Sequence, residues 1–140
     1  MIRPAVPADE SRLEAIQSAA LDDPWPELLA VAIDGPPHVL VADEGAGPIA
    51  YALTVPDEPV AYVAELAVAP GLQGQGYGSE LLGALLDELR EVGFEEVRLT
   101  ARADDDRVRS FYDGFGFAVE ADLPDHYDDG GAGVLLVRDL

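Results

Sequence analysis

The sequence contains no cysteine, only one tryptophan and only two histidines. Without cysteine the chain can form neither a disulfide bond nor a zinc site with thiolate ligands. No apolar run approaches the roughly 20 residues that a membrane-spanning helix needs, and the first residues lack the apolar core of a signal peptide. These absences predict a soluble domain in the cytoplasm that holds no metal ion.

Positive charge is also scarce. Eight arginines and no lysine stand against 28 acidic residues, which gives a formal net charge of −20. Such a chain repels nucleic acids and anionic lipid headgroups, so binding to nucleic acid or to a membrane is not expected. Two origins of the acidity stay open: a halophilic, salt-rich cytoplasm, or a GC-rich genome that favours arginine. At about 1 M salt the Debye length is about 3 Å, so the halophilic origin predicts stability that rises with salt.

Length and apolar content indicate one folded domain over residues 1–140. Apolar residues make up 49% of the chain, too many for an acidic disordered protein. Hydrophobic periodicity predicts strands at 1–6, 38–42, 49–55, 61–68, 96–101, 117–121 and 133–138. Helices are expected after an N-cap at Asp9, near 27–31, over about 79–92 and over about 106–113. Strands that come in blocks and then alternate with helices predict a mixed α+β sheet.

The most informative segment is a glycine-rich loop. It follows the strand at 61–68 and precedes a helix with a leucine face, and it reads Gln73, Gly74, Gln75, Gly76, Tyr77, Gly78. Glycine lets the backbone approach a ligand closely and adopt positive φ. The first N–H groups of a helix have no intrahelical partner and lie at the positive end of its dipole. The loop is therefore expected to bind a phosphate or pyrophosphate through backbone groups, without a lysine.

Two well-known phosphate loops are excluded by sequence. A P-loop requires a Gly-Lys pair, and the chain has no lysine. In the dinucleotide pattern G-x-G-x-x-G, started at Gly74 or Gly76, the third glycine falls on Ser79 or Leu81. A glycine-rich turn without any ligand remains an alternative for the loop taken by itself.

The remaining pattern, Gln73-x-x-Gly76-x-Gly78, resembles the pyrophosphate loop of the acetyl-CoA-dependent N-acetyltransferase (GNAT) superfamily. The flanks resemble the family as well: an apolar strand that ends in Val-Ala-Pro at 68–70, and an aromatic pair with Gly-Phe over 111–117. The resemblance implies an α+β fold with a largely antiparallel sheet of six to seven strands and about four helices. It also implies that the strands flanking the loop splay apart and hold acetyl-CoA between them.

The resemblance assigns the site residues one by one. It implies contacts with acetyl-CoA, the cosubstrate, from Leu66, Ala67, Val68, Gln73, Gly74, Gln75, Gly76, Tyr77, Gly78, Ser79 and Asp105. The Val68 N–H would bind the thioester carbonyl, and Tyr112 would protonate the leaving thiolate. Tyr112 also fits a purely structural place on an apolar helix face. For the base, either Glu65 or water is considered, and Glu65 also fits an exposed position on a strand.

Two residues depart from the family pattern. Thr100 stands where some relatives have a glutamate, which counts against the branch that acetylates ribosomal protein N-termini. Asp105 stands where the family often has asparagine, and a carboxylate beside a polyphosphate is favourable only if it caps the helix and points away. Arg102, Arg107 and Arg109 are the arginines nearest in sequence to the site for the 3′-phosphate.

The expected activity is transfer of acetyl to a primary amine, on a small molecule or a peptide, by direct attack in a ternary complex. A non-catalytic acyl-CoA-binding sensor on the same fold is the alternative. Segments around 21–37 and 122–132 are expected to select the acceptor, and His126 and Tyr127 lie either in its pocket or in a solvated loop. Family members often dimerise through late strands, so a homodimer stays open.

Overall fold

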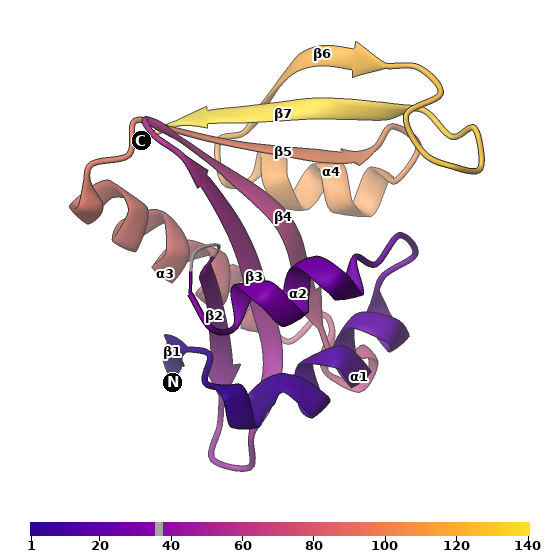
Figure 1. The fold of residues 1–140 in the computed structure, drawn as a ribbon. Coiled ribbons are helices and arrows are strands. Elements are labelled where there is room, and N and C mark those ends of the chain that lie inside the picture. Colours follow the sequence, from indigo (N-terminus) through magenta and orange to yellow (C-terminus); the bar gives the residue numbers. More distant parts are fainter. Residues whose placement is uncertain (36–37) are drawn as a thin grey trace.

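The computed structural model describes residues 1–35 and 38–140, so Pro36 and Pro37, at the end of the expected acceptor segment, lie outside the described residues. Within that part the chain forms four α-helices and seven strands (Figure 1). In chain order they are β1 (Ile2–Pro4), α1 (Glu10–Ala20), α2 (Pro26–Ala32), β2 (His38–Asp43), β3 (Pro48–Asp57), β4 (Val60–Val68), α3 (Tyr77–Val92), β5 (Glu96–Arg102), α4 (Asp106–Asp113), β6 (Ala118–Leu123) and β7 (Gly133–Asp139). The order of elements predicted from the sequence is confirmed.

The seven strands form one mixed sheet in the order β1-β2-β3-β4-β5-β7-β6. All neighbours are antiparallel except β4 and β5, which run parallel and pair only over three positions, from Val60 with Glu96 to Tyr62 with Arg98. Beyond these positions the two strands diverge, and Figure 1 shows β4 and β5 separating from a common end. The predicted α+β fold with a splay between the strands that flank the glycine loop is confirmed.

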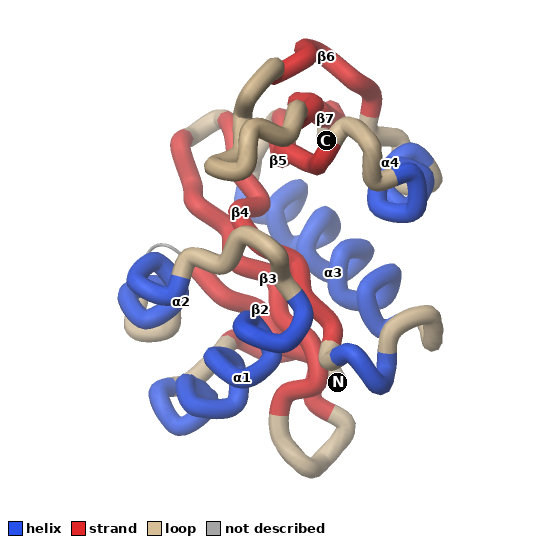
Figure 2. The backbone as a smooth tube through the Cα atoms, turned by 90° about the vertical axis from the view of Figure 1, so that its right-hand side faces the viewer, coloured by secondary structure: helices blue, strands red, loops and turns tan. Residues whose placement is uncertain are grey.

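Helices cover both faces of the sheet. Figure 2 shows α1 and α2 on one side, and α3 and α4 on the other. Five leucines of α3 fill the core on its side, namely Leu81, Leu82, Leu85, Leu86 and Leu89. The helix begins at Tyr77, two residues before the predicted start, because Gly76 takes the left-handed conformation that allows the turn. Val92, the last residue of α3, is 66% exposed and does not extend this leucine face.

A β-bulge changes which face of β4 is buried against which helices. The pairing of β3 with β4 shifts between Leu53 and Thr54, so that Leu53 pairs with Glu65 and Thr54 with Val63. Before the bulge Val63 packs in the core under α3, whereas after it Ala67 packs in the core under α1 and α2. The bulge thereby turns the side chain of Glu65 toward α1 and α2.

Asp9 occupies the N-cap position of α1, as predicted, but its carboxylate makes no capping bond to that helix. It accepts hydrogen bonds from the Arg3 guanidinium at 2.8 and 3.1 Å and from the Val6 N–H at 2.9 Å. The hydrogen bonds from Arg3 lower the pKa of the Asp9 carboxyl below its usual value. Over the described ranges, every helix is too short or too polar for a membrane span.

Candidate active site

The open side of β4 carries free backbone donors where the sheet splays. The Ala69 N–H donates to the Ile49 carbonyl of β3 at 2.9 Å. Because N–H groups alternate in direction along a strand, Ala67 also points its N–H toward β3, whereas Leu66 and Val68 point theirs toward the splay. Of the three β4 residues assigned to the cofactor, Leu66 and Val68 therefore keep donors on the open side, and Ala67 does not.

The glycine loop lies at the mouth of the splay and is exposed to solvent. Gly74 and Gly76 have φ of +79° and +92°, values that side-chain-bearing residues rarely adopt. The first bond of α3 joins the Glu80 N–H to the Gly76 carbonyl at 3.0 Å. The N–H groups that precede Glu80 in the first turn have no intrahelical acceptor, and they belong to Tyr77, Gly78 and Ser79. These three N–H groups lie at the positive end of a 16-residue helix, which is the backbone arrangement expected of an anion site.

Two side chains hold this loop against its neighbours. The Gln73 side-chain amide donates to the Val68 carbonyl at 3.1 Å, which ties the loop to the end of β4. A methyl group built on Gly78 would lie 3.6 Å from Val68 and 3.7 Å from the Phe111 ring. The start of α3, the end of β4 and α4 therefore meet at Gly78, where glycine leaves room between the strand and the aromatic ring.

The three candidate arginines differ in what they contact. Arg102 forms ion pairs with Asp23 at 2.8 Å and Asp129 at 3.1 Å, and Arg109 donates to a backbone carbonyl of the preceding loop at 2.8 Å. A methyl group built on Gly74 would lie 3.8 Å from Nη2 of Arg107. Arg107 is thus the arginine of the three whose guanidinium lies at the glycine loop.

Helix α4 is fixed at its start by Asp105. The Asp105 carboxylate accepts a hydrogen bond from the Val108 N–H at 3.1 Å, three residues further on. This is an N-cap interaction, which satisfies one of the unpaired donors of the helix. Of the two conditions stated for an aspartate at this position, the structure shows the first, that the carboxylate caps the helix.

Tyr112 is buried in α4, with 8% of its surface exposed. Its ring centroid lies 5.1 Å from that of Phe111 and 5.5 Å from that of Phe117, both in edge-on arrangements. Burial raises the pKa of the Tyr112 hydroxyl above the usual value of about 10. At neutral pH the hydroxyl is consequently protonated and able to donate a proton.

Glu65 lies in surroundings that the sequence did not indicate. Instead of standing exposed or in an apolar cleft, it is 7% exposed and accepts four hydrogen bonds. Oε1 accepts from the Gln17 amide at 2.9 Å and the Tyr51 hydroxyl at 3.0 Å, and Oε2 accepts from Gln17 at 3.2 Å and the Trp25 N–H at 2.8 Å. Burial beside Glu65 raises the pKa of the Tyr51 hydroxyl, so Tyr51 remains a donor. The network joins α1, β3 and β4 to the loop between α1 and α2.

Arg102 was considered only as a phosphate ligand, but it links the loops expected to select the acceptor. It pairs with Asp23 between α1 and α2 and with Asp129 between β6 and β7, and it stacks on the Tyr127 ring at 4.2 Å. Along the chain, Asp23 is 79 positions from Arg102 and Asp129 is 27 positions from it. No local motif signals such pairs, although a lone arginine at the end of a strand among many aspartates was visible in the sequence.

Comparison with known proteins identifies the class. Residues 7–117 match the model of the acetyltransferase (GNAT) family. Ribosomal protein bS18-alanine N-acetyltransferase of Haemophilus ducreyi is 33% identical over 120 residues, which cover 84% of this chain and 81% of that protein. Mycothiol acetyltransferase of Beutenbergia cavernae is 38% identical over 84 residues, or 59% of this chain, but those residues span only 28% of its own length.

A solved structure of Ard1 from Thermoplasma volcanium superposes on the fold with a TM-score of 0.93. It is 25% identical, and the match covers 100% of this chain and 97% of that one. The chain belongs to the GNAT acetyltransferase family, and the predicted acyltransferase activity is confirmed at the level of that family.

Proposed function

We propose that this protein transfers the acetyl group of acetyl-CoA to a primary amine by direct attack within a ternary complex. The observation that carries the proposal is the splay of β4 from β5 beside the exposed start of α3. That arrangement offers free N–H donors along β4 for an extended arm and free N–H donors on the helix for its pyrophosphate.

In this proposal the pyrophosphate binds at the first turn of α3, where Tyr77, Gly78 and Ser79 present their N–H groups. Gln73, Gly74, Gln75 and Gly76 shape the loop around it, and Arg107 supplies a positive charge at its edge. The pantetheine arm runs along β4 and bonds to the Leu66 N–H. The thioester carbonyl accepts a hydrogen bond from the Val68 N–H.

The amine nitrogen attacks the thioester carbon, and the negative charge that develops on oxygen is stabilised by the Val68 N–H. The C–S bond then breaks, and the leaving thiolate takes a proton from Tyr112, which regains one from water before the next turnover. Because the free thiol has a pKa near about 8.5, below the raised pKa of Tyr112, the main contribution of the hydroxyl is a hydrogen bond donated to the developing thiolate. The proton of the attacking amine passes to water, either directly or on to Glu65.

Glu65→Gln separates the two options for the base. If Glu65 receives the proton through water, the variant loses kcat while its Kd for acetyl-CoA stays unchanged. If water alone is the base, kcat is retained. Glu65 accepts bonds from Gln17 and from the Trp25 N–H of the α1–α2 loop, and the NH2 group of a glutamine cannot accept such bonds. The thermal midpoint of the variant is therefore measured as well, so that a structural loss is separated from a loss of the base.

For the acceptor we propose a peptide α-amine as the first class to test. The support is the relative that matches over 84% of this chain, whose name specifies an alanine of ribosomal protein bS18. Thr100, where some relatives have a glutamate, argues against an identical peptide-binding mode. The net charge of −20 favours cationic acceptors in general.

The test is release of free thiol from acetyl-CoA in molar KCl, with a panel of an Ala-initiated peptide, a lysine peptide and a polyamine. Catalysed release that depends on one of these amines, with acetylated product by mass spectrometry, supports the proposal. Tight binding of acetyl-CoA without any amine-dependent release would favour the alternative, an acyl-CoA-binding sensor.

A further inference from the structure

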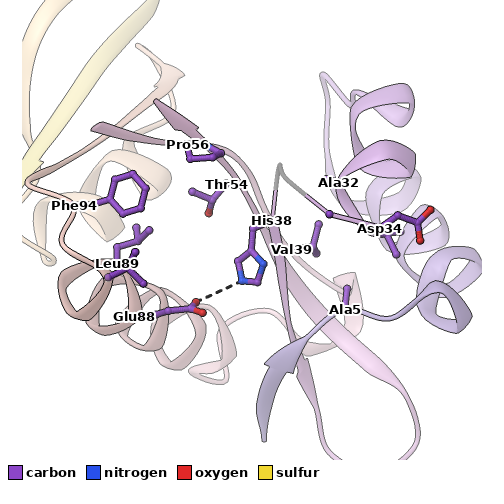
Figure 3. A pocket seen from close by; sticks show the side chains of 13 residues that line it. Ala5, Ala32, Asp34, His38, Val39, Thr54, Pro56, Glu88, Leu89 and Phe94 are labelled. Atoms are coloured by element: carbon purple, nitrogen blue, oxygen red, sulfur yellow. Dashed lines mark ion pairs between the residues drawn. The ribbon is translucent and has the colours of Figure 1, made fainter. Parts of the chain in front are cut away.

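A second cavity, of about 520 Å³, lies at the end of α3 remote from the glycine loop (Figure 3). Its walls include Glu88 and Leu89 of α3, Phe94 after the helix, and residues at the start of β2 and the end of β3. Gly76 and Glu88 are twelve residues apart on one helix, which corresponds to about 18 Å at 1.5 Å per residue. The cavity is therefore separate from the proposed acetyl-CoA site.

Three polar atoms in this cavity are buried without a hydrogen-bond partner among the described residues: His38 Nε2, Thr54 Oγ1 and Glu88 Oε2. His38 and Thr54 are cross-strand partners in the β2–β3 pairing, so they lie side by side. Glu88 Oε2 lies 3.5 Å from His38 Nε2, so the two form an ion pair whenever His38 is protonated, and each side chain is 41% exposed. Figure 3 shows the three side chains converging, with Phe94 and Leu89 beside them.

Unsatisfied buried polar atoms are rare, because each one has lost its bonds to water without replacement. Thr54 is the most informative, because it is only 3% exposed and no described residue bonds to its hydroxyl. An unpaired hydroxyl beside the Glu88 carboxylate and His38 indicates a polar guest that bonds to Thr54 Oγ1.

The chemistry of the three atoms selects the guest. A carboxylate only accepts hydrogen bonds, while a hydroxyl and the Nε2 of a neutral histidine can each accept one. A primary ammonium has three N–H donors, one for each atom. The negative end of the α3 dipole and the net charge of −20 both favour a cation here. The apolar side chains of Pro56, Leu89 and Phe94 are suited to an aromatic or branched aliphatic body.

We propose that this cavity is a second binding site, specific for a small primary amine with an apolar body. The ammonium binds Glu88, Thr54 and His38, and the body packs between the end of β3 and the end of α3. The site is independent of acetyl transfer, since none of its residues belongs to the glycine loop or contacts Tyr112 in the aromatic cluster.

Benzylamine, titrated into isotopically labelled protein without acetyl-CoA, is the probe, and amide chemical shifts are the readout. We expect saturable shifts at Val39, Leu89 and Phe94, with benzyl alcohol binding at least tenfold more weakly. Glu88→Gln is expected to raise the Kd for benzylamine at least tenfold. Asp87→Asn removes the same charge from the adjacent, solvent-exposed position of α3 and is expected to bind like the parent protein.

Thr54→Val gives a second, distinctive readout. Because it replaces an unsatisfied buried hydroxyl by a methyl of the same shape, it is expected to raise the thermal midpoint while it weakens benzylamine several-fold. A merely structural Thr54 would leave benzylamine affinity unchanged.

The proposal is overturned if these amides do not shift at millimolar benzylamine, if benzyl alcohol binds equally well, or if Asp87→Asn weakens binding as much as Glu88→Gln. Shifts confined to the splay would mean that amines bind only as acceptors, and this too overturns it. Because acetyl-CoA is absent from the titration, failure of the catalytic proposal would leave this result untouched, and the reverse also holds.

Discussion

Replacing Tyr112 by phenylalanine removes one hydroxyl from a ring that two aromatic neighbours and helix α4 hold in place. The edge-on contacts to Phe111 and Phe117 do not involve that hydroxyl, so the ring is expected to keep its position. General acid catalysis typically contributes 10²–10⁴-fold. A thiolate leaves more readily than most groups, so we expect a loss of about ten- to a hundredfold in kcat, or about 1.4–2.7 kcal/mol in the barrier.

The assay is amine-dependent thiol release, measured together with the Kd for acetyl-CoA. The Kd is expected to stay within about twofold, and the matched control Tyr62→Phe, at a 39% exposed position on β4, is expected to retain kcat. Because burial raises the Tyr112 pKa above its usual value, the parent enzyme should show no loss of kcat from Tyr112 ionisation as pH rises to about 10. An unchanged kcat in Tyr112→Phe would refute the assignment.

Three further predictions concern the cradle, α4 and the acidic surface. Gly76→Ala forces an L-residue into a left-handed conformation at a cost of about 1–2 kcal/mol. It should raise the Kd for acetyl-CoA, measured by calorimetry, about five- to thirtyfold. Gly83→Ala, in open space on the same helix, should leave that Kd unchanged. Asp105→Ala removes the cap of α4, so we expect denaturant titrations to show a free energy of unfolding lower by about 1 kcal/mol. The control Asp104→Ala, at an exposed position, should leave that free energy unchanged. The unfolding midpoint should rise between about 0.1 and 1 M KCl as screening increases, and a flat profile contradicts the halophilic origin.

The fold and the glycine loop could be predicted because their signals are local. Three features each determine the structure within a few residues of themselves. They are the leucine periodicity of α3, the two glycines with positive φ in the loop, and Gly93 at the end of the helix. Gly93 ends α3 with a φ of +109°, and its N–H bonds to the carbonyls of Leu89 and Arg90 in the last turn. Such features depend on backbone conformation and short-range periodicity, which a sequence displays directly.

The surroundings of Glu65 and Arg102 could not be predicted, because they depend on pairs distant in sequence. A single bulged position between Val63 and Glu65 moves the Glu65 side chain to the opposite face of the sheet. The alternation of apolar residues along β4 gives no sign of this bulge. Arg102 forms ion pairs with Asp23 and Asp129, two of 28 acidic residues. These two are its partners because the fold places their loops beside Arg102, which the sequence does not show. Asp9 was predicted to cap α1, but its carboxylate instead forms an ion pair with Arg3 of β1.

The central claim is that backbone N–H groups at the start of α3 hold the pyrophosphate of acetyl-CoA. Amide chemical shifts recorded while acetyl-CoA is titrated in molar KCl test it most directly. The account predicts 1:1 binding, with the largest shifts at Gly76, Tyr77, Gly78 and Ser79 and a further shift at the Val68 amide. Absence of binding, or binding that leaves these amides unshifted, would contradict it.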